Sequence, residues 1–315
     1  MKVMKKLNEK EIIKTFQQKK FVAEDVEIFQ LGKELCAVNI DTLVESTDIP
    51  PKSDFTDIAR KSVVSSLSDF AAKGLTPKFC IISVTIPKKF SKTQIKKMAM
   101  GFRKACNEFR LEYLGGDTNE GKEIVIHVVL FGKGDKIVTR NGAKNGDIII
   151  TTGPFGYTSS ALQILLKKKK ATKQFLKLAK TKFFQPTPRL KFGLECKNLL
   201  SSSIDSSDGL SSCLQELSDC SKKRFVITSL PVTDDVVSFA KMNRLNLRSI
   251  TLNGGEEFEL VCTVPFKNLE KVKKIAKKLK ISLYEIGFVT KGKHVIMEND
   301  GMPYRMMDSG WSHFQ

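Results

Sequence analysis

The first half of the chain alternates short apolar runs with segments of helical spacing. Residues 26–31 and 35–44 are two extended runs joined at Gly32-Lys33, a pattern typical of a strand hairpin. Further strands are predicted at residues 79–86, 112–114 and 123–132, and helices at residues 8–17, 57–73 and 91–109. Helix 57–73 contains small residues that allow close packing on a sheet, and Gly74 ends it.

The second half repeats this mixture of strands and helices. Strands are predicted at residues 147–152, 203–206, 225–228, 259–264 and 295–297. Helices are predicted at residues 158–166, 190–199, 208–220, 234–242 and 268–280, together with a lysine-rich helix that ends near residue 186. Because 315 residues are many for one core, we expect two α+β domains, residues 1–138 and 139–315, meeting near residues 132–140.

The charge of the chain favours an anionic partner. Lys and Arg outnumber Asp and Glu by 53 to 34, which gives a net charge of +19, and a strongly positive field attracts phosphates, nucleic acid or acidic lipid. Much of the excess lies in lysine runs at residues 167–170, 177–182 and 271–280. These runs are interpreted as solvated helix faces, because no aromatic residues are interleaved for base stacking; nucleic acid is therefore not favoured.

The cysteines and the N-terminal residues indicate the cellular compartment in which the protein is expected. Seven cysteines without a CxxC pair indicate reduced thiols. The first sixteen residues alternate charge with apolar residues and lack the apolar core of a signal peptide. No segment reaches membrane-spanning length, so we expect a cytoplasmic protein with no membrane partner.

Carboxylates at the ends of elements are the candidate chemistry. Asp41 interrupts an apolar run, which costs free energy unless the charge is paired or binds a metal. Two of these carboxylates also have a purely structural interpretation: Asp208 as a helix cap and Asp117 as a turn residue. Hard oxygen ligands suit Mg²⁺, which binds carboxylates and substrate phosphates together. The candidate metal ligands are Asp25, Asp41, Asp69, Asp117, Asp205 and Asp208.

Other features point the same way. The turns Gly115-Gly116 and Gly254-Gly255 allow backbone N–H groups to approach phosphate. Arg140 is interpreted either as a phosphate contact or as a surface arginine. With only three histidines, no Ser/His/Asp or Cys/His nucleophile and no zinc site is evident. Phosphoryl transfer to an acceptor that is already an ionised phosphate needs no general base.

Short motifs recur in a fixed order over almost the whole chain. They lie at residues 23–27, 39–45, 66–74, 115–118, 140–147, 152–156, 186–189, 205–210, 254–260 and 310–314. As an ordered set they resemble the thiamine-monophosphate kinase family of the AIR-synthase-like (PurM-like) superfamily. The resemblance implies a two-domain PurM-like α+β fold, with an N-terminal mixed sheet with helices and a C-terminal α/β sandwich, and a homodimer joined through the N-terminal domains.

The resemblance also implies an activity and roles for particular residues. It implies ATP-dependent phosphorylation of thiamine monophosphate to thiamine diphosphate, assisted by several Mg²⁺ ions held by the six aspartates named above. The implied catalytic residues among them are Asp69, Asp205 and Asp208. The implied ATP contacts are Gly115, Gly116, Arg140 and Ser207, and the implied thiamine-phosphate contacts are Asp48, Glu256 and Trp311.

Two alternatives stay open at this point: another ATP-dependent enzyme of the superfamily, and a non-catalytic basic paralogue that binds nucleotide or nucleic acid. The second is motivated by the charge and by departures from the family pattern. Ala23-Glu24 replaces Gly-Asp, Asn39-Ile40 replaces Ser-Thr, and Asp48 stands where bacterial members often place a histidine. Binding to nucleic acid would weaken steeply with salt, whereas catalysis would require Mg²⁺ and ATP.

Overall fold

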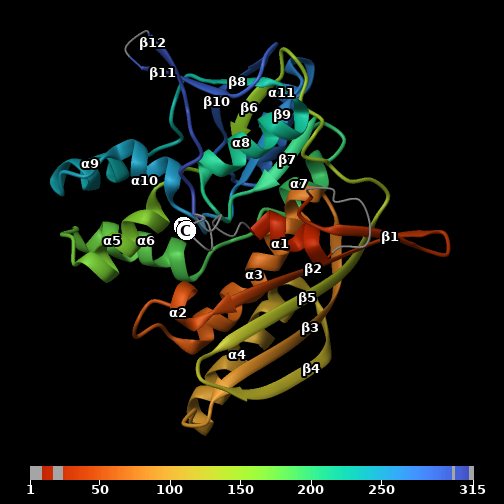
Figure 1. Cartoon of the computed structure of the whole chain (residues 1–315), viewed down its shortest axis with the longest axis vertical. Coiled ribbons are helices and arrows are strands. Elements are labelled where there is room, and N and C mark those ends of the chain that lie inside the picture. The colour runs from red at the N-terminus through yellow and green to blue at the C-terminus, as the bar shows by residue number, and fades with distance from the viewer. Residues whose placement is uncertain (1–8, 17–23, 300–301, 312–315) are drawn as a thin grey trace, which may run out of the picture.

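The computed structural model describes residues 9–16, 24–299 and 302–311, and it contains two mixed sheets with their own helices (Figure 1). The predicted helix at residues 8–17 is α1 (Glu9–Phe16). The predicted hairpin is confirmed as β1 (Glu27–Leu31) and β2 (Glu34–Val44), which pair antiparallel. Its tip projects beyond the rest of the N-terminal sheet.

The N-terminal sheet has the strand order β1-β2-β5-β3-β4, and its remaining strands are β3 (Thr76–Pro87), β4 (Glu112–Gly121) and β5 (Val125–Gly134). Helix α4 (Lys92–Phe109) forms the crossover between β3 and β4, which are therefore parallel, whereas the other neighbours are antiparallel. A capping box at Ser91 starts α4. Helices α3 (Phe55–Lys73) and α4 share one core with the inward side chains of the sheet.

The prediction for β4 was wrong in its length. The strand continues through Gly115-Gly116-Asp117 to Gly121, where the sequence was read as a short strand followed by a turn. One extra residue is inserted near Leu114, because Tyr113 lies opposite Cys80 whereas Gly115 lies opposite Ile81. Such a bulge interrupts the alternation by which a strand is recognised in a sequence.

The C-terminal sheet has the order β12-β11-β8-β10-β6-β9-β7. Its strands are β6 (Ile148–Thr151), β7 (Ser202–Asp205), β8 (Arg224–Ile227), β9 (Leu260–Val264), β10 (Tyr284–Thr290), β11 (Val295–Asn299) and β12 (Met302–Arg305). The helices are α5 (Tyr157–Lys167), α6 (Lys173–Phe184), α7 (Leu190–Cys196), α8 (Leu210–Ser221), α9 (Asp234–Met242), α10 (Leu247–Asn253) and α11 (Phe266–Lys278).

Helices cover both faces of this sheet, as a sandwich requires. Leu214 of α8 shares a core with Ile149 of β6, whereas Phe192 of α7 and Val272 of α11 share another core with Ile150, the next residue of the same strand. Successive strand residues point to opposite faces, so the two cores lie on opposite sides of β6. Helices α5, α6, α9 and α10 form a separate apolar cluster beside the sheet.

The two-domain α+β architecture is confirmed, and the boundary between residues 138 and 139 stays a prediction. Four elements were not predicted: α2 (Glu45–Asp48), α10, β10 and β12. Helices α2 and α10 have only 4 and 7 residues, too few to show a helical period. Strand β10 is irregular between Glu285 and Gly287, which obscures its alternation.

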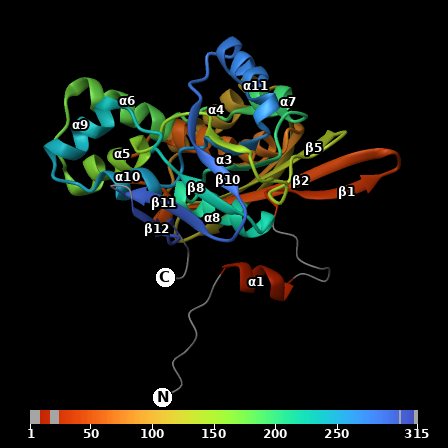
Figure 2. The same cartoon turned by 90° about the horizontal axis from the view of Figure 1, so that it is seen from above.

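Helix α3 connects the two domains. It packs on β2 and β5 of its own domain and also contacts β7 and α7 of the other (Figures 1 and 2). Ala71 and Ala72 at its C-terminal end belong to the core that contains Phe192. Gly193 of α7 approaches so closely that a Cβ there would lie 1.9 Å from the Ala71 carbonyl oxygen. None of the helices in the described ranges has the length and apolar character needed to cross a membrane.

Candidate active site

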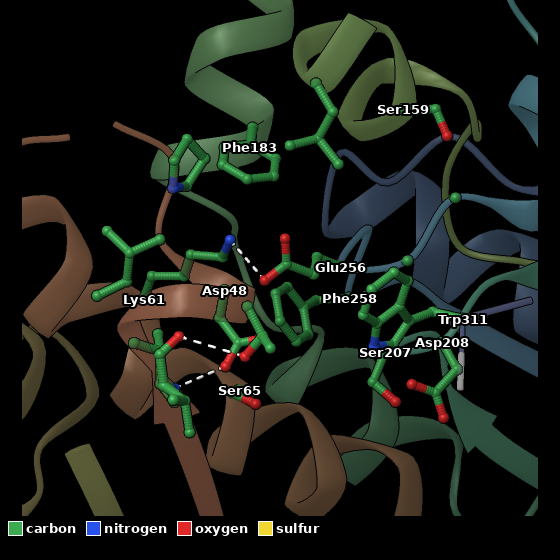
Figure 3. A pocket seen from close by; sticks show the side chains of 18 of the residues that line it. Asp48, Lys61, Ser65, Ser159, Phe183, Ser207, Asp208, Glu256, Phe258 and Trp311 are labelled. Atoms are coloured by element: carbon green, nitrogen blue, oxygen red, sulfur yellow. Dashed lines mark hydrogen bonds and ion pairs between the residues drawn. The ribbon is translucent and has the colours of Figure 1, made fainter. Parts of the chain in front are cut away.

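A cleft of about 870 Å³ lies between the domains (Figure 3). The N-terminal domain contributes the end of β2, helix α2 and one side of α3, and the C-terminal domain contributes α5, α6, α10 and two loops. The loops contain Ser207-Asp208 and Gly254–Glu256, and Trp311 lies beside them. The two loops are tied together, because the backbone N–H of Glu256 donates to the carbonyl of Ser207 at 2.7 Å.

Three of the predicted metal ligands meet next to this cleft. Asp25 lies two residues before β1, Asp69 lies on α3 and Asp205 is the last residue of β7. One carboxylate oxygen from each residue lies within 4.8 Å of the others. The contact of α3 with β7 brings Asp69 close to Asp205, and Lys73 on the same helix pairs with Asp25, so carboxylates far apart in the sequence come together.

The electrostatics of this acid cluster (Asp25, Asp69 and Asp205) favour a cation. Burial, followed by the charges of Asp41, Asp205 and Asp25, raises the pKa of Asp69 well above its usual range. Burial and the charge of Asp25 raise the pKa of Asp205 to about 7. Asn39 Nδ2 donates to Asp69 Oδ2 at 2.7 Å and so fixes its direction. Carboxylates close enough to repel one another are a suitable donor set for Mg²⁺, a hard cation.

Asp25 differs from the other two members of the cluster. Its Oδ2 lies 2.6 Å from Lys73 Nζ, and its Oδ1 accepts from Nε and Nη2 of Arg140. These neighbours outweigh burial and lower the pKa of Asp25 below its usual range. Arg140 also pairs with Glu216 through Nη1 at 3.4 Å. The guanidinium group predicted to contact ATP is thus held by two carboxylates in this structure.

Asp41 and Asp208 both line the cleft. Asp41 points to the helix-covered side of the sheet, as do its neighbours Ala37, Asn39 and Leu43, and it lies close enough to raise the pKa of Asp69. The carbonyl oxygen of Asp208 accepts from the backbone N–H of Trp311 at 2.8 Å, which joins the C-terminal segment to the cleft.

Asp117 lies elsewhere in the same chain. Strand β4 is three strands away from β2, or about 14 Å at a spacing of ~4.8 Å. In the strand register Asp117 follows the row of Thr42, His127 and Ser83, which faces away from the helices. Gly115 and Gly116 are in the same strand, and none of the three lines the cleft. A Cβ at Gly116 would lie 1.7 Å from the Ile82 carbonyl oxygen. Close packing against β3 therefore explains why residue 116 is a glycine.

The predicted thiamine-phosphate contacts also line the cleft. Glu256 and Trp311 line it, as does Ser207, a predicted ATP contact, and Trp311 is 55% exposed (Figure 3). Asp48 also lines it, and its Oδ2 accepts from the backbone N–H of Val44 at 2.6 Å. The departure at Ala23 and the motif residues 312–314 lie outside the described residues.

Lys61 and Phe183 were missed by the sequence analysis. Lys61 Nζ lies 2.6 Å from Glu256 Oε1 and 3.8 Å from the centre of the Phe183 ring, although its side chain is only 4% exposed (Figure 3). A signal was present: Lys61, Ser65, Asp69 and Lys73 are spaced four residues apart in a helix otherwise rich in small and apolar residues. Side chains at this spacing follow one side of a helix.

Two family models match the chain. "AIR synthase related protein, N-terminal domain" matches residues 23–134, and "AIR synthase related protein, C-terminal domain" matches residues 144–299. The N-terminal match covers the five-stranded sheet, and the C-terminal match covers most of the seven-stranded sheet.

Named relatives are similar over their full length. A thiamine-monophosphate kinase of Nitrosopumilus maritimus is 49% identical over 99% of this chain and 100% of the relative. One of Pyrococcus horikoshii is 31% identical over 99% of this chain and 98% of the relative. A solved structure described as AaThiL complexed with AMPPCP and TMP superposes with a TM-score of 0.88 at 25% identity, covering 98% of this chain and 97% of that one.

Proposed function

The chain belongs to the thiamine-monophosphate kinase family, and we propose that it transfers the γ-phosphoryl group of ATP to thiamine monophosphate, forming thiamine diphosphate and ADP. The observation that carries this proposal is the arrangement of the cleft. Carboxylates that favour a cation lie next to it, and its lining includes the oppositely charged pair Lys61 and Glu256 and the exposed ring of Trp311.

We propose that Asp69 and Asp205, with Asp41 and Asp208 nearby, hold Mg²⁺ at the phosphate end of the cleft. When bound there, Mg²⁺ would neutralise charge on the triphosphate of ATP and on the acceptor phosphate, which must approach each other. The chain itself contributes rigid carboxylates: Asp69 is held by Asn39, and Asp205 ends a buried strand. No general base is needed, because the acceptor phosphate is already ionised, and the cleft residues mainly position the reactants.

The pair Lys61 and Glu256 matches the charges of thiamine monophosphate, which carries a cationic thiazolium ring and an anionic phosphate. We assign Lys61 to the phosphate and Glu256 to the cationic ring. When the substrate binds, the anionic phosphate would take the place of Glu256 beside Lys61, and the cationic ring would take the place of Lys61 beside Glu256. The exposed Trp311 ring is available for stacking on the aromatic rings of thiamine.

We propose a homodimer joined through the uncovered face of the N-terminal sheet. Leu31 and Ile40 on this face are 68% and 63% exposed, which is unusual for large apolar strand residues. Ile40, Val129 and Ile81 form a row next to the row that ends at Asp117. A second copy on this face would bring its own Gly115–Asp117 segment toward the cleft of its partner, which accounts for the position of these residues.

We also place the enzyme in the cytoplasm. All seven cysteines are free, and five of them are buried. Free thiols in this number are typical of a reducing compartment.

The proposal is tested by incubating the purified chain with ATP, Mg²⁺ and thiamine monophosphate and separating the products by chromatography. We expect thiamine diphosphate and ADP in equal amounts. Asp205→Asn and Asp69→Asn should each lower kcat by about 100-fold or more, the size of effect seen when a group stabilising transition-state charge is removed. Asp219→Asn, an exposed position on α8, is the matched control. Wild-type turnover in folded Asp205→Asn protein would contradict the proposal.

A further inference from the structure

Lys73 is a fully buried lysine beside the acid cluster, and the reaction described above gives it no role. Its side chain is 0% exposed. Nζ lies 2.5 Å from Glu24 Oε2, 2.6 Å from Asp25 Oδ2 and 3.2 Å from the carbonyl oxygen of Ser203. An ammonium group has three N–H donors, so these three oxygens match its full capacity.

The position of this charge is fixed by the fold. Lys73 is the last residue of α3, and Gly74 ends the helix. The carbonyl oxygen of Lys73 accepts from the backbone N–H of Val138 at 3.1 Å. Two residues earlier, Ala71 is packed against Gly193 of the other domain. A lysine anchored in this way presents its ammonium group at one place, unlike the mobile lysines of a surface.

Lys73 and Arg140 are the two cations that contact Asp25. Lys73 also pairs with Glu24, Arg140 also pairs with Glu216, and the backbone N–H of Arg140 donates to Glu24 Oε1 at 3.1 Å. Both oxygens of Asp25 therefore face protein cations. On the other side, a carboxylate oxygen of Asp69 lies within 4.8 Å of one of Asp205, and Asp69 accepts from the neutral side chain of Asn39. Within the acid cluster, Asp25 thus already has two protein cations as partners, whereas Asp69 and Asp205 are two like charges close together.

We propose that Lys73 is a permanent counter-ion of the metal centre: its ammonium group takes the cation position between Glu24 and Asp25, and divalent ions bind only on the side of Asp69 and Asp205. The inference rests on the proposed function, since it assumes divalent ions at those two aspartates. A divalent ion at Asp25 is disfavoured because it would lie within a few ångströms of Lys73, a positive charge that cannot move away.

The first test counts bound ions. The number of Mn²⁺ ions bound per chain, without nucleotide, is measured by electron paramagnetic resonance for the wild type, Lys73→Met and Lys73→Arg. Methionine keeps an unbranched apolar side chain and removes the charge, whereas arginine keeps the charge. We expect Lys73→Met to bind one more Mn²⁺ than the wild type and its melting temperature to rise with added Mn²⁺, and Lys73→Arg to bind the wild-type number. Equal numbers in all three proteins would overturn the proposal.

The second test uses the wild-type chain and does not depend on how the variants fold. Crystals are soaked in Mn²⁺ and its anomalous scattering is located. Mn²⁺ on Asp69 and Asp205, with Asp25 still paired to Lys73, supports the counter-ion role. Mn²⁺ coordinated by Asp25 overturns that role but leaves the metal-dependent reaction intact. Absence of Mn²⁺ from all three carboxylates would overturn both proposals.

Discussion

Glu257 shows how a single buried carboxyl group makes stability depend on pH. Its Oε1 accepts from the backbone N–H groups of Gly156 at 2.7 Å and Thr158 at 3.1 Å. Burial raises the pKa of Glu257 from 4.5 to about 7. Between these values the folded chain keeps a proton that the unfolded chain has released. The stability associated with this group is therefore complete below pH 4.5 and is lost as the pH rises to about 7.

Replacing Glu257 by glutamine should remove this dependence. Glutamine keeps an acceptor for both N–H groups and never ionises. The free energy of unfolding of Glu257→Gln, relative to the wild type, should grow from near zero at pH 4.5 to as much as about 3 kcal/mol above pH 7, since one pKa unit corresponds to ~1.4 kcal/mol. Urea unfolding at pH 5 and pH 8 measures it, with the exposed Glu270→Gln as control. A difference that is the same at both pH values would refute the explanation.

Replacing Lys61 should affect the KM of one substrate much more than that of the other. Its side chain lines the cleft and is assigned to the phosphate of thiamine monophosphate. Lys61→Met should raise KM for thiamine monophosphate about 10- to 100-fold, because a hydrogen bond to a charged group contributes ~1.5–3 kcal/mol, and should change KM for ATP much less. Steady-state kinetics with each substrate varied in turn measures this, with the half-exposed Lys97→Met as control. Equal increases in both KM values would remove Lys61 from the thiamine-phosphate pocket.

At the scale of elements, α3 sets the geometry of the site, and its contact with α7 holds it in place. In a helix, Gly193→Ala would by propensity alone stabilise the chain by about 1 kcal/mol. Here the new Cβ meets a backbone oxygen, which no side-chain rotation relieves. We therefore expect a net loss of ~1–3 kcal/mol in urea unfolding. Lys191→Ala on the exposed side of α7 is the control, and a stabilised Gly193→Ala would show that the helices separate easily.

At the scale of the whole molecule, the proposed homodimer, together with the predicted role of Asp117 as a metal ligand, predicts that each active site is shared by two chains. Asp117→Asn and Asp205→Asn should each inactivate the homodimer. Mixed dimers of the two variants should contain one intact site, so random mixing should restore about a quarter of wild-type activity. The variants are unfolded together, refolded and assayed, after sedimentation has established the dimer. Mixed samples without activity would show that each chain completes its own site.

Much of this protein follows from its sequence. Most strands and helices were predicted, because their apolar residues recur with the period of the element that forms. The ordered motifs identified the family, and Asp69 and Asp205 were among the predicted metal ligands. Asp41, Ser207, Asp208, Glu256 and Trp311 were also predicted, and all of them line the cleft.

Only the tertiary structure decided which of these residues meet. Asp69 reaches Asp205 because α3 packs between the domains, and no local pattern reports a contact over that separation. One extra residue near Leu114 turns Asp117 to the opposite face of its sheet, since strand side chains alternate with a period of two. Lys73 became part of the site only when folding buried its charge between two carboxylates. The sequence determines the elements and their chemistry, whereas distance, face and burial depend on contacts between segments far apart in the chain.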